Sequence, residues 1–170
     1  MISKLEATNE VFVCKEGNTG KGESLLMVKD AITYKQQSRI EKFSKLDVEC
    51  YDTQAFNAGD QKWKIQVYPK GKGTGIGTHI SLFLALADPS TLPPNSKIYA
   101  KFKLTIVSQT NSNLHQSRTE TYWFSASKKE CGWNRFLTLD YFDYPSLGYL
   151  VKDTCCVEAE VTIHGVASRT

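Results

Sequence analysis

The sequence predicts an all-β fold, an antiparallel β-sandwich, on two observations. First, apolar and polar residues alternate in two neighbouring segments, 63–68 and 79–86, with the period of half-buried strands. Pro69 and a glycine-rich turn join them into a hairpin whose apolar face needs a second layer to cover it. Second, more short strand patterns follow along the chain, with Pro-, Ser- and Asn-rich loops between them and no long helical pattern.

The other elements are expected in chain order. Short strands are predicted at 10–13, 38–43, 53–56, 98–107, 122–124 and 157–163, and residues 137–142 are predicted as a single helical turn. The polar, glycine-containing tract 15–24 is predicted as a linker. The strand patterns at 98–107 and 157–163 are the clearest, since Phe102, Leu104 and Ile106 share one face of the first.

Length and composition limit the classes of function that are possible. At 170 residues the chain is long enough for one well-buried core and too short for two domains of ordinary size. Its net charge of +3 is mild, so we expect no nucleic-acid partner. No apolar run approaches the roughly 18 residues of a membrane helix, so we expect no membrane insertion. Five cysteines, odd in number and irregular in spacing, predict reduced thiols and a cytoplasmic protein, with the nucleus as a further compartment.

Catalytic and metal-binding patterns are absent from the sequence. None of the three histidines lies near a recognised nucleophile motif. Cys155 and Cys156 are adjacent rather than spaced as zinc ligands, and we expect one thiol in the core and the other on the surface. The glycine loop 71–77 precedes a strand, whereas phosphate-binding loops precede a helix. We therefore expect no enzymatic activity, no metal and no cofactor.

A set of short motifs carries a family resemblance. They are IEKFS at 40–44, FNAG at 56–59, KWK at 62–64, YPKG at 68–71, HISLFL at 79–84, YAKF at 99–102, GYLVKDT at 148–154 and VEAEV at 157–161. In this order they resemble the MATH (meprin and TRAF-C homology) domain over about residues 33–164. Segments 49–52 and 86–90 are similar to plant tandem-MATH, TRAF-like proteins. The resemblance implies an eight-stranded antiparallel β-sandwich.

The resemblance also implies a domain organisation. Residues 33–166 would form the MATH domain and 167–170 a tail. Residues 1–32 would be an N-terminal strand and linker, the remnant of a preceding MATH repeat. The pattern of 10–13 agrees with this, because it is repeated at 160–163.

In this family an extended peptide adds to an exposed sheet edge, and an aromatic-lined hollow receives its side chains. By resemblance, the hollow here would involve His79, Phe102, Tyr122, Cys131 and Trp133, and the edge would be Lys129, Glu130, Cys131 and Gly132. This chain departs from the family pattern at His79, where an aromatic is common, at 131–133, where Trp-Gly-Phe is usual, and at Ser38, where a tryptophan is usual. We therefore expect an altered peptide preference and a frayed or weakly packed first strand. Lys128 and Lys129 beside Cys131 could lower its pKa, but an unreactive thiol is the expectation. Lys101, Lys103, Lys128, Lys129 and Arg135 are expected to form a solvated face; if they rim the groove instead, they would favour acidic or phosphorylated peptides.

The resulting hypothesis is a non-catalytic module that binds short extended segments of partner proteins, as an adaptor in ubiquitin-linked or plant immune-signalling assemblies. Self-association through the N-terminal strand is a further possibility. Two alternatives stay open: the MATH module of a ubiquitin protease whose catalytic domain lies elsewhere, and a carbohydrate-binding β-sandwich.

Overall fold

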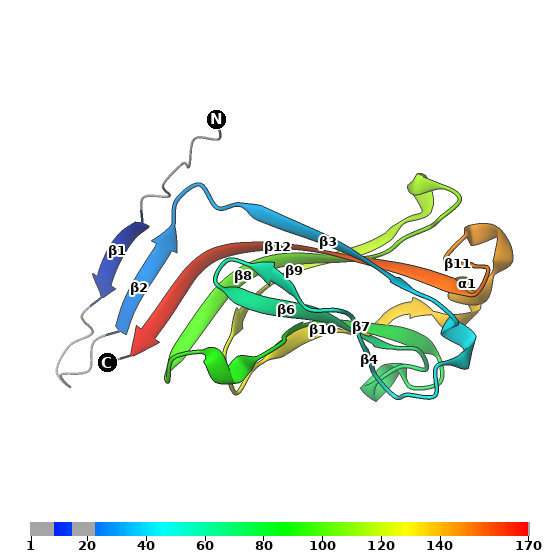
Figure 1. Ribbon diagram of the computed structural model, residues 1–170, viewed down its shortest axis with the longest axis horizontal. Coiled ribbons are helices and arrows are strands. Elements are labelled where there is room, and N and C mark those ends of the chain that lie inside the picture. Colours follow the sequence, from blue (N-terminus) through cyan, green and yellow to red (C-terminus); the bar gives the residue numbers. More distant parts are fainter. Residues whose placement is uncertain (1–8, 15–22, 170) are drawn as a thin grey trace.

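The computed structural model describes residues 9–14 and 23–169. Most of the predicted linker, 15–22, lies outside the described residues, and its last two positions, Glu23 and Ser24, begin a strand. The described residues form two antiparallel sheets that stack as a sandwich (Figure 1). The predicted fold class is therefore confirmed.

Sheet A has seven strands: β1 (Asn9–Cys14), β2 (Glu23–Val28), β3 (Thr33–Ile40), β8 (Ser96–Ile106), β9 (Gln116–Phe124), β11 (Leu150–Val151) and β12 (Thr154–Arg169). Sheet B has five: β4 (Tyr51–Asp52), β5 (Phe56–Ala58), β6 (Gln61–Tyr68), β7 (His79–Leu86) and β10 (Glu130–Thr138). The helix α1 (Leu139–Asp143) confirms the predicted helical turn. The described part has twelve strands where eight were expected; β1 and β2 precede the predicted domain, and β4, β5 and β11 have only two or three residues each. No helix of the described part is long and apolar enough to cross a membrane.

Strand order places β9 and β10 at sheet edges. Sheet A runs β1-β2-β12-β8-β9, with β3 and β11 also paired to β12. Sheet B runs β10-β7-β6-β4, with β5 also paired to β6. The edge strands β9 and β10 contact one another across the gap between the sheets. This side of the sandwich therefore presents two unpaired strand edges together.

The core follows the alternation that the sequence predicts. Its inward side chains come from both sheets and are at most 2% exposed: Trp63, Ile65, Val67, Ile80, Leu82, Leu84, Phe102, Leu104, Ile106, Val157, Ala159 and Val161. The polar atom of the largest of them is satisfied, since the Trp63 indole N–H donates to the Ala58 carbonyl at 3.0 Å. Burial of this apolar surface, at about 25 cal/mol per Å², holds the two sheets together.

The long strand β12 joins the domain to the N-terminal segment. It pairs with β3 from Cys155 to Thr162 and with β2 from Gly165 to Arg169, with a register shift between Ile163 and Gly165. Figure 1 shows that β1, β2 and the end of β12 project beyond sheet B. The described part of the expected tail, 167–169, is thus a paired strand, and β1 and β2 continue sheet A instead of standing apart from it.

Two local expectations need correction. The first strand of the domain, β3, is not frayed, because all eight of its residues pair with β12. It is weakly packed, since Ile40 is its one buried residue and Ser38 is half-buried. The expectation of one surface thiol at 155–156 is wrong, because Cys155 and Cys156 are both buried. Cys156 faces away from the core, but the Arg39 guanidinium covers it, with Nη1 3.9 Å from Sγ.

Candidate functional site

The free edge of sheet B is the strand β10. Its register sets Cys131 opposite Leu84 and Gly132 opposite Phe83 of β7. The Leu86 N–H donates to the Lys129 carbonyl, which therefore points toward β7. Because this direction alternates along an antiparallel strand, the backbone groups of Glu130 and Gly132 point away from the sheet. They are available to an added strand.

The inward face of β10 carries an aromatic cluster. Trp133 is half-buried, and its ring lies 5.6 Å from Phe102 and 5.8 Å from Phe136 between centroids. Tyr122 of β9 is also half-buried and packs edge-on against Phe124 at 5.0 Å. Phe102 itself is only 1% exposed, so it supports Trp133 from below and offers no surface to a ligand. The accessible aromatic surface is that of Trp133 and Tyr122.

The facing strand β9 contributes two charged residues that the sequence analysis missed. Arg118 and Glu120 alternate with outward residues and so share the face of Tyr122. The Arg118 guanidinium lies over the Phe136 ring at 5.6 Å and donates to the Phe136 carbonyl at 3.2 Å. Glu120 has no ion pair in the described part of the chain. Residues 117–121 are exposed and polar, so no apolar alternation in the sequence marked this part of the strand.

The outward face of β10 is tied to the glycine loop between β6 and β7. Lys72 Nζ lies 2.8 Å from a carboxylate oxygen of Glu130 and stands over the rings of Tyr68 and Phe83. Burial disfavours the charged ammonium, but the hydrogen bond to Glu130 and its negative neighbours raise the pKa of Lys72 above its ordinary value. The carboxylate of Glu130 is therefore directed away from the aromatic cluster.

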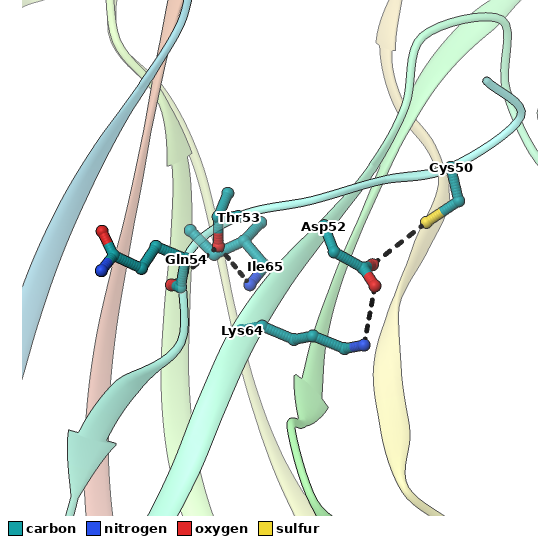
Figure 2. Close-up of polar contacts among 6 residues, drawn as sticks. All are labelled: Cys50, Asp52, Thr53, Gln54, Lys64 and Ile65. Atoms are coloured by element: carbon teal, nitrogen blue, oxygen red, sulfur yellow. Dashed lines mark hydrogen bonds and ion pairs between the residues drawn. The ribbon is translucent and has the colours of Figure 1, made fainter.

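At the opposite edge of sheet B, β6 is covered by β4, Thr53 and β5. Thr53 exchanges two hydrogen bonds with Ile65 of β6: its N–H donates to the Ile65 carbonyl at 3.0 Å, and its Oγ1 accepts from the Ile65 N–H at 2.9 Å. Beside it, Asp52 accepts from Lys64 at 2.7 Å and from the Cys50 thiol at 3.5 Å (Figure 2). The backbone of β6 is thus occupied, and this edge consists of the two- and three-residue strands β4 and β5, whereas β10 is a nine-residue edge strand.

The structure does not assemble every predicted site residue. His79 pairs with Thr138 at the far end of β7 and bonds to Thr78, about 17 Å along the strand from the position opposite Cys131. Lys129 is exposed at the start of β10. Of the predicted hollow residues, Tyr122, Cys131 and Trp133 are partly buried against the core that contains Phe102.

The alternative arrangement, a basic rim, is also not assembled. Lys101 and Lys103 alternate with inward residues of β8 and so lie on the outer face of sheet A, where Lys103 pairs with Glu160 at 2.8 Å. Arg135 donates to the Thr74 carbonyl of the glycine loop. These residues give no support to a preference for acidic peptides.

Cys131 agrees with the expectation of an unreactive thiol, and the alternative of a lowered pKa is wrong. Burial, with a smaller contribution from the negative charge of Glu120, raises the pKa of Cys131 to about 11. The nearby lysines do not offset this. Its thiol is therefore protonated at neutral pH and forms part of the apolar wall instead of acting as a nucleophile.

Metal ligation finds no support in the described residues. No group of three or more His, Cys, Asp or Glu side chains among them is arranged to hold a metal ion.

Comparison with known proteins identifies a family and several relatives of the chain. The MATH domain model matches residues 35–161. Ubiquitin C-terminal hydrolase 13 of Arabidopsis thaliana is 35% identical over 128 residues, which cover 75% of this chain and 11% of the hydrolase. Ubiquitin C-terminal hydrolase 12 of the same plant is 33% identical over 137 residues, 81% of this chain and 12% of the hydrolase. The chain thus spans only a small part of both enzymes.

Two further similarities agree with this match. A MATH domain and coiled-coil domain-containing protein of Arabidopsis thaliana is 33% identical over 124 residues, 73% of this chain and 37% of that protein. TRAF5 of Notothenia coriiceps shares the fold with a TM-score of 0.59 at 24% identity, covering 75% of this chain and 72% of that one. On the extent of the family match, the chain belongs to the MATH domain family.

Proposed function

We propose that this chain is a non-catalytic interaction module that binds extended peptide segments of partner proteins at the β10 edge. The single observation that supports it best is the position of Trp133. It lies half-buried on an unpaired edge strand whose neighbouring backbone groups, at Glu130 and Gly132, point outward. Strand addition supplies affinity through such backbone groups, and pockets for alternate side chains supply specificity.

The side chains at this edge suggest the chemistry of the peptide. Trp133 and Tyr122 offer aromatic surface to one apolar side chain. Neither Arg118 nor Glu120 has an ion pair in the described residues, but Arg118 is engaged by the carbonyl and ring of Phe136, whereas Glu120 accepts only from the Thr121 N–H. A peptide with an apolar residue and a nearby Lys or Arg fits this arrangement better than an acidic or phosphorylated one.

The biological setting is proposed from the relatives. Their printed names include ubiquitin C-terminal hydrolases and MATH and coiled-coil proteins. An adaptor in a ubiquitin-linked assembly in the cytoplasm or nucleus is consistent with these names and with four unpaired cysteines in the described part. The second candidate, the MATH module of a ubiquitin protease, is favoured by the 35% identity to hydrolase 13. Peptide capture at β10 is compatible with both candidates, the adaptor and the MATH module of a ubiquitin protease.

The N-terminal strand supports one further proposal on organisation. β1 is the terminal strand of sheet A and pairs with β2, which lies between β1 and β12. The sequence pattern of β1 repeats that of β12. We propose that β1 is the last strand of a preceding MATH repeat. Sequencing the full-length transcript tests this directly, and a different upstream domain would contradict it.

The test of peptide capture combines two steps. Proximity labelling in plant cells identifies partners, and an array of overlapping peptides from those partners is then probed with the 1–170 chain. Trp133→Ala is expected to weaken the best peptide roughly tenfold or more, because one aromatic contact of 1.5–3 kcal/mol is lost. Trp123→Ala is the matched control. Trp123 is 38% exposed on the outer face of β9, where it stacks on Tyr99 at 4.8 Å. Equal binding by wild type and Trp133→Ala would refute the assignment of this edge.

A further inference from the structure

A second apolar site lies at the end of the sandwich. A cavity of about 660 Å³ separates the projecting part of sheet A from two turns of sheet B. We call it the end cavity. Its floor is formed by Leu26 of β2, Val166 of β12 and Ile98 of β8, which are cross-strand neighbours in that order. The β5–β6 turn at 58–61 and the β7–β8 loop at 91–93 form the opposite wall. It shares no lining residue with the β9–β10 edge.

The register shift in β12 creates this cavity. β3 leaves β12 at Thr162, and β2 pairs with it from Gly165 onward. Because of the shift between Ile163 and Gly165, the side chains of Ile163 and Val166 both line the cavity, although they are three residues apart. Sheet A therefore continues its apolar inner face past the point where sheet B covers it (Figure 1).

Apolar side chains remain partly uncovered around the cavity. Leu26, Val28, Ile163 and Val166 are half-buried, and Ile32 at the lip is 65% exposed. A contiguous apolar surface of this kind on a folded protein marks a contact site. The volume lies within the range of ordinary ligand pockets.

The charges of the lining select the kind of occupant. Asp30 and Asp60 are its charged residues, and no lysine, arginine or histidine lines it. Neither carboxylate has a hydrogen bond or ion pair in the described part of the chain. A segment with a cationic side chain next to an apolar one would complement this surface. A second copy docked face to face would instead bring the aspartates of both copies together, at an electrostatic cost.

We propose that the end cavity binds a segment of a partner protein that inserts an aliphatic or aromatic side chain over Leu26, Ile98 and Val166. An adjacent Lys or Arg of that segment pairs with Asp30 and Asp60. The site is distinct from the β10 edge, so the MATH domain has two independent contact surfaces. One partner can therefore occupy both, or two partners can be held together.

The test uses the 1–170 chain carrying Trp133→Ala, so that the β10 edge is disabled. A random dodecapeptide phage library is panned on it, and the selected peptides are synthesised with a fluorescein label and titrated by anisotropy into the same Trp133→Ala chain. We expect a consensus that joins an aliphatic or aromatic residue to Lys or Arg. The affinity is expected to fall as NaCl rises from about 0.05 to about 0.5 M, since salt screens exposed pairs.

Matched variants locate the binding. Ile32→Ser is expected to weaken the peptide roughly tenfold or more, whereas Ile76→Ser, at an equally exposed isoleucine of the glycine loop, leaves it unchanged. Asp30→Asn combined with Asp60→Asn is expected to lower the affinity for the peptide roughly threefold to thirtyfold. Asp140→Asn, on the exposed face of α1, is expected to leave the affinity unchanged.

Several outcomes overturn the proposal. They are the absence of any selected peptide, a consensus without a basic residue, and equal loss of binding in Ile32→Ser and Ile76→Ser. A dimer that Ile32→Ser dissociates in sedimentation velocity would show that the occupant is a second copy. Panning and titration both use the Trp133→Ala chain, and Ile32, Asp30 and Asp60 line the end cavity, so a failure here is distinguishable from a failure of peptide capture at β10.

Discussion

Trp133 of sheet B packs on Phe102 of sheet A with 5.6 Å between ring centroids, so the edge strand β10 is anchored on a central strand of the other sheet. Phe102 is buried at 1% exposure, whereas Trp133 keeps part of its surface accessible. The two rings of this aromatic pair therefore have different roles. The inner ring stabilises the sandwich, and the outer ring is left for recognition.

Replacing Phe102 is therefore expected to damage the fold. Phe102→Ala would leave a cavity beneath Trp133 and lower the free energy of unfolding by about 3–5 kcal/mol. Urea denaturation followed by circular dichroism measures this. Trp123→Ala, on the outer face of β9, is expected to lower it by much less. A loss below about 1 kcal/mol for Phe102→Ala would show that this ring is not part of the core.

The sequence predicted the central strands well and the site only through family resemblance. In β6, β8 and the 157–163 part of β12, every second residue is apolar and faces the core, and in β7 the leucines recur with the same period of two, which is the signal of a strand with one face in the core. In β10 this alternation is broken by Gly132 and by a register shift between Trp133 and Leu137. Most of β9, at 117–121, is exposed and polar, so it has no apolar pattern to detect.

The end cavity could not be predicted from local sequence at all. It depends on the pairing of β2 with β12, which are more than a hundred residues apart, and on the register shift after Ile163. Serine and glutamate at the start of β2 resemble the polar tract before them. The prediction that His79 lies near Cys131 was wrong for a related reason. The resemblance assigned His79 to the correct strand, but the register of β7 places it opposite Thr138, at the end of the strand far from Cys131.

Gly132 is expected to be required by the close approach of β10 to β7. A Cβ at this position would lie 2.1 Å from the Leu82 carbonyl oxygen, which is backbone and cannot give way cheaply. Gly132→Ala should therefore lower the free energy of unfolding by about 1–3 kcal/mol and speed hydrogen exchange in β10. Gly77→Asn is the comparison, because nothing lies within 4 Å of its Cβ and asparagine tolerates its positive φ of 76°. Similar exchange in β10 for both variants would contradict the steric argument.

Cys131 is expected to react slowly with alkylating reagents. With its pKa raised to about 11 by burial and by Glu120, it forms thiolate at pH 8 roughly a hundredfold less than a thiol with the ordinary value of 9.0. Iodoacetamide labelling followed by peptide mass spectrometry should show this delay relative to glutathione. Glu120→Gln should shorten the delay, since it removes a negative charge that opposes ionisation. Labelling as fast as glutathione would mean that Cys131 is not part of a buried wall.

The raised pKa of Cys131 also makes the free energy of unfolding depend on pH. The unfolded chain releases the Cys131 proton near pH 9, whereas the folded chain holds it to about 11. The folded state is therefore favoured fully below pH 9, and this contribution is lost as pH rises through that window. The stability difference between wild type and Cys131→Ser should shrink over the same range. A difference that is constant from pH 8 to pH 11 would contradict it.

Lys72 is expected to fasten the glycine loop to the β10 edge through Glu130. The pair is 2.8 Å long and about one third exposed on each side, so a double-mutant cycle with Lys72→Met and Glu130→Gln should give a coupling of about 0.2–1 kcal/mol. Lys72→Met keeps the apolar stem over Phe83 and removes only the charge. Hydrogen exchange near Glu130 should then accelerate, and the coupling should fade at high salt. Lys101→Met, at an exposed lysine without an ion pair in the described part, is the control. If it changes exchange at Glu130 as much, the effect comes from net charge and not from this contact.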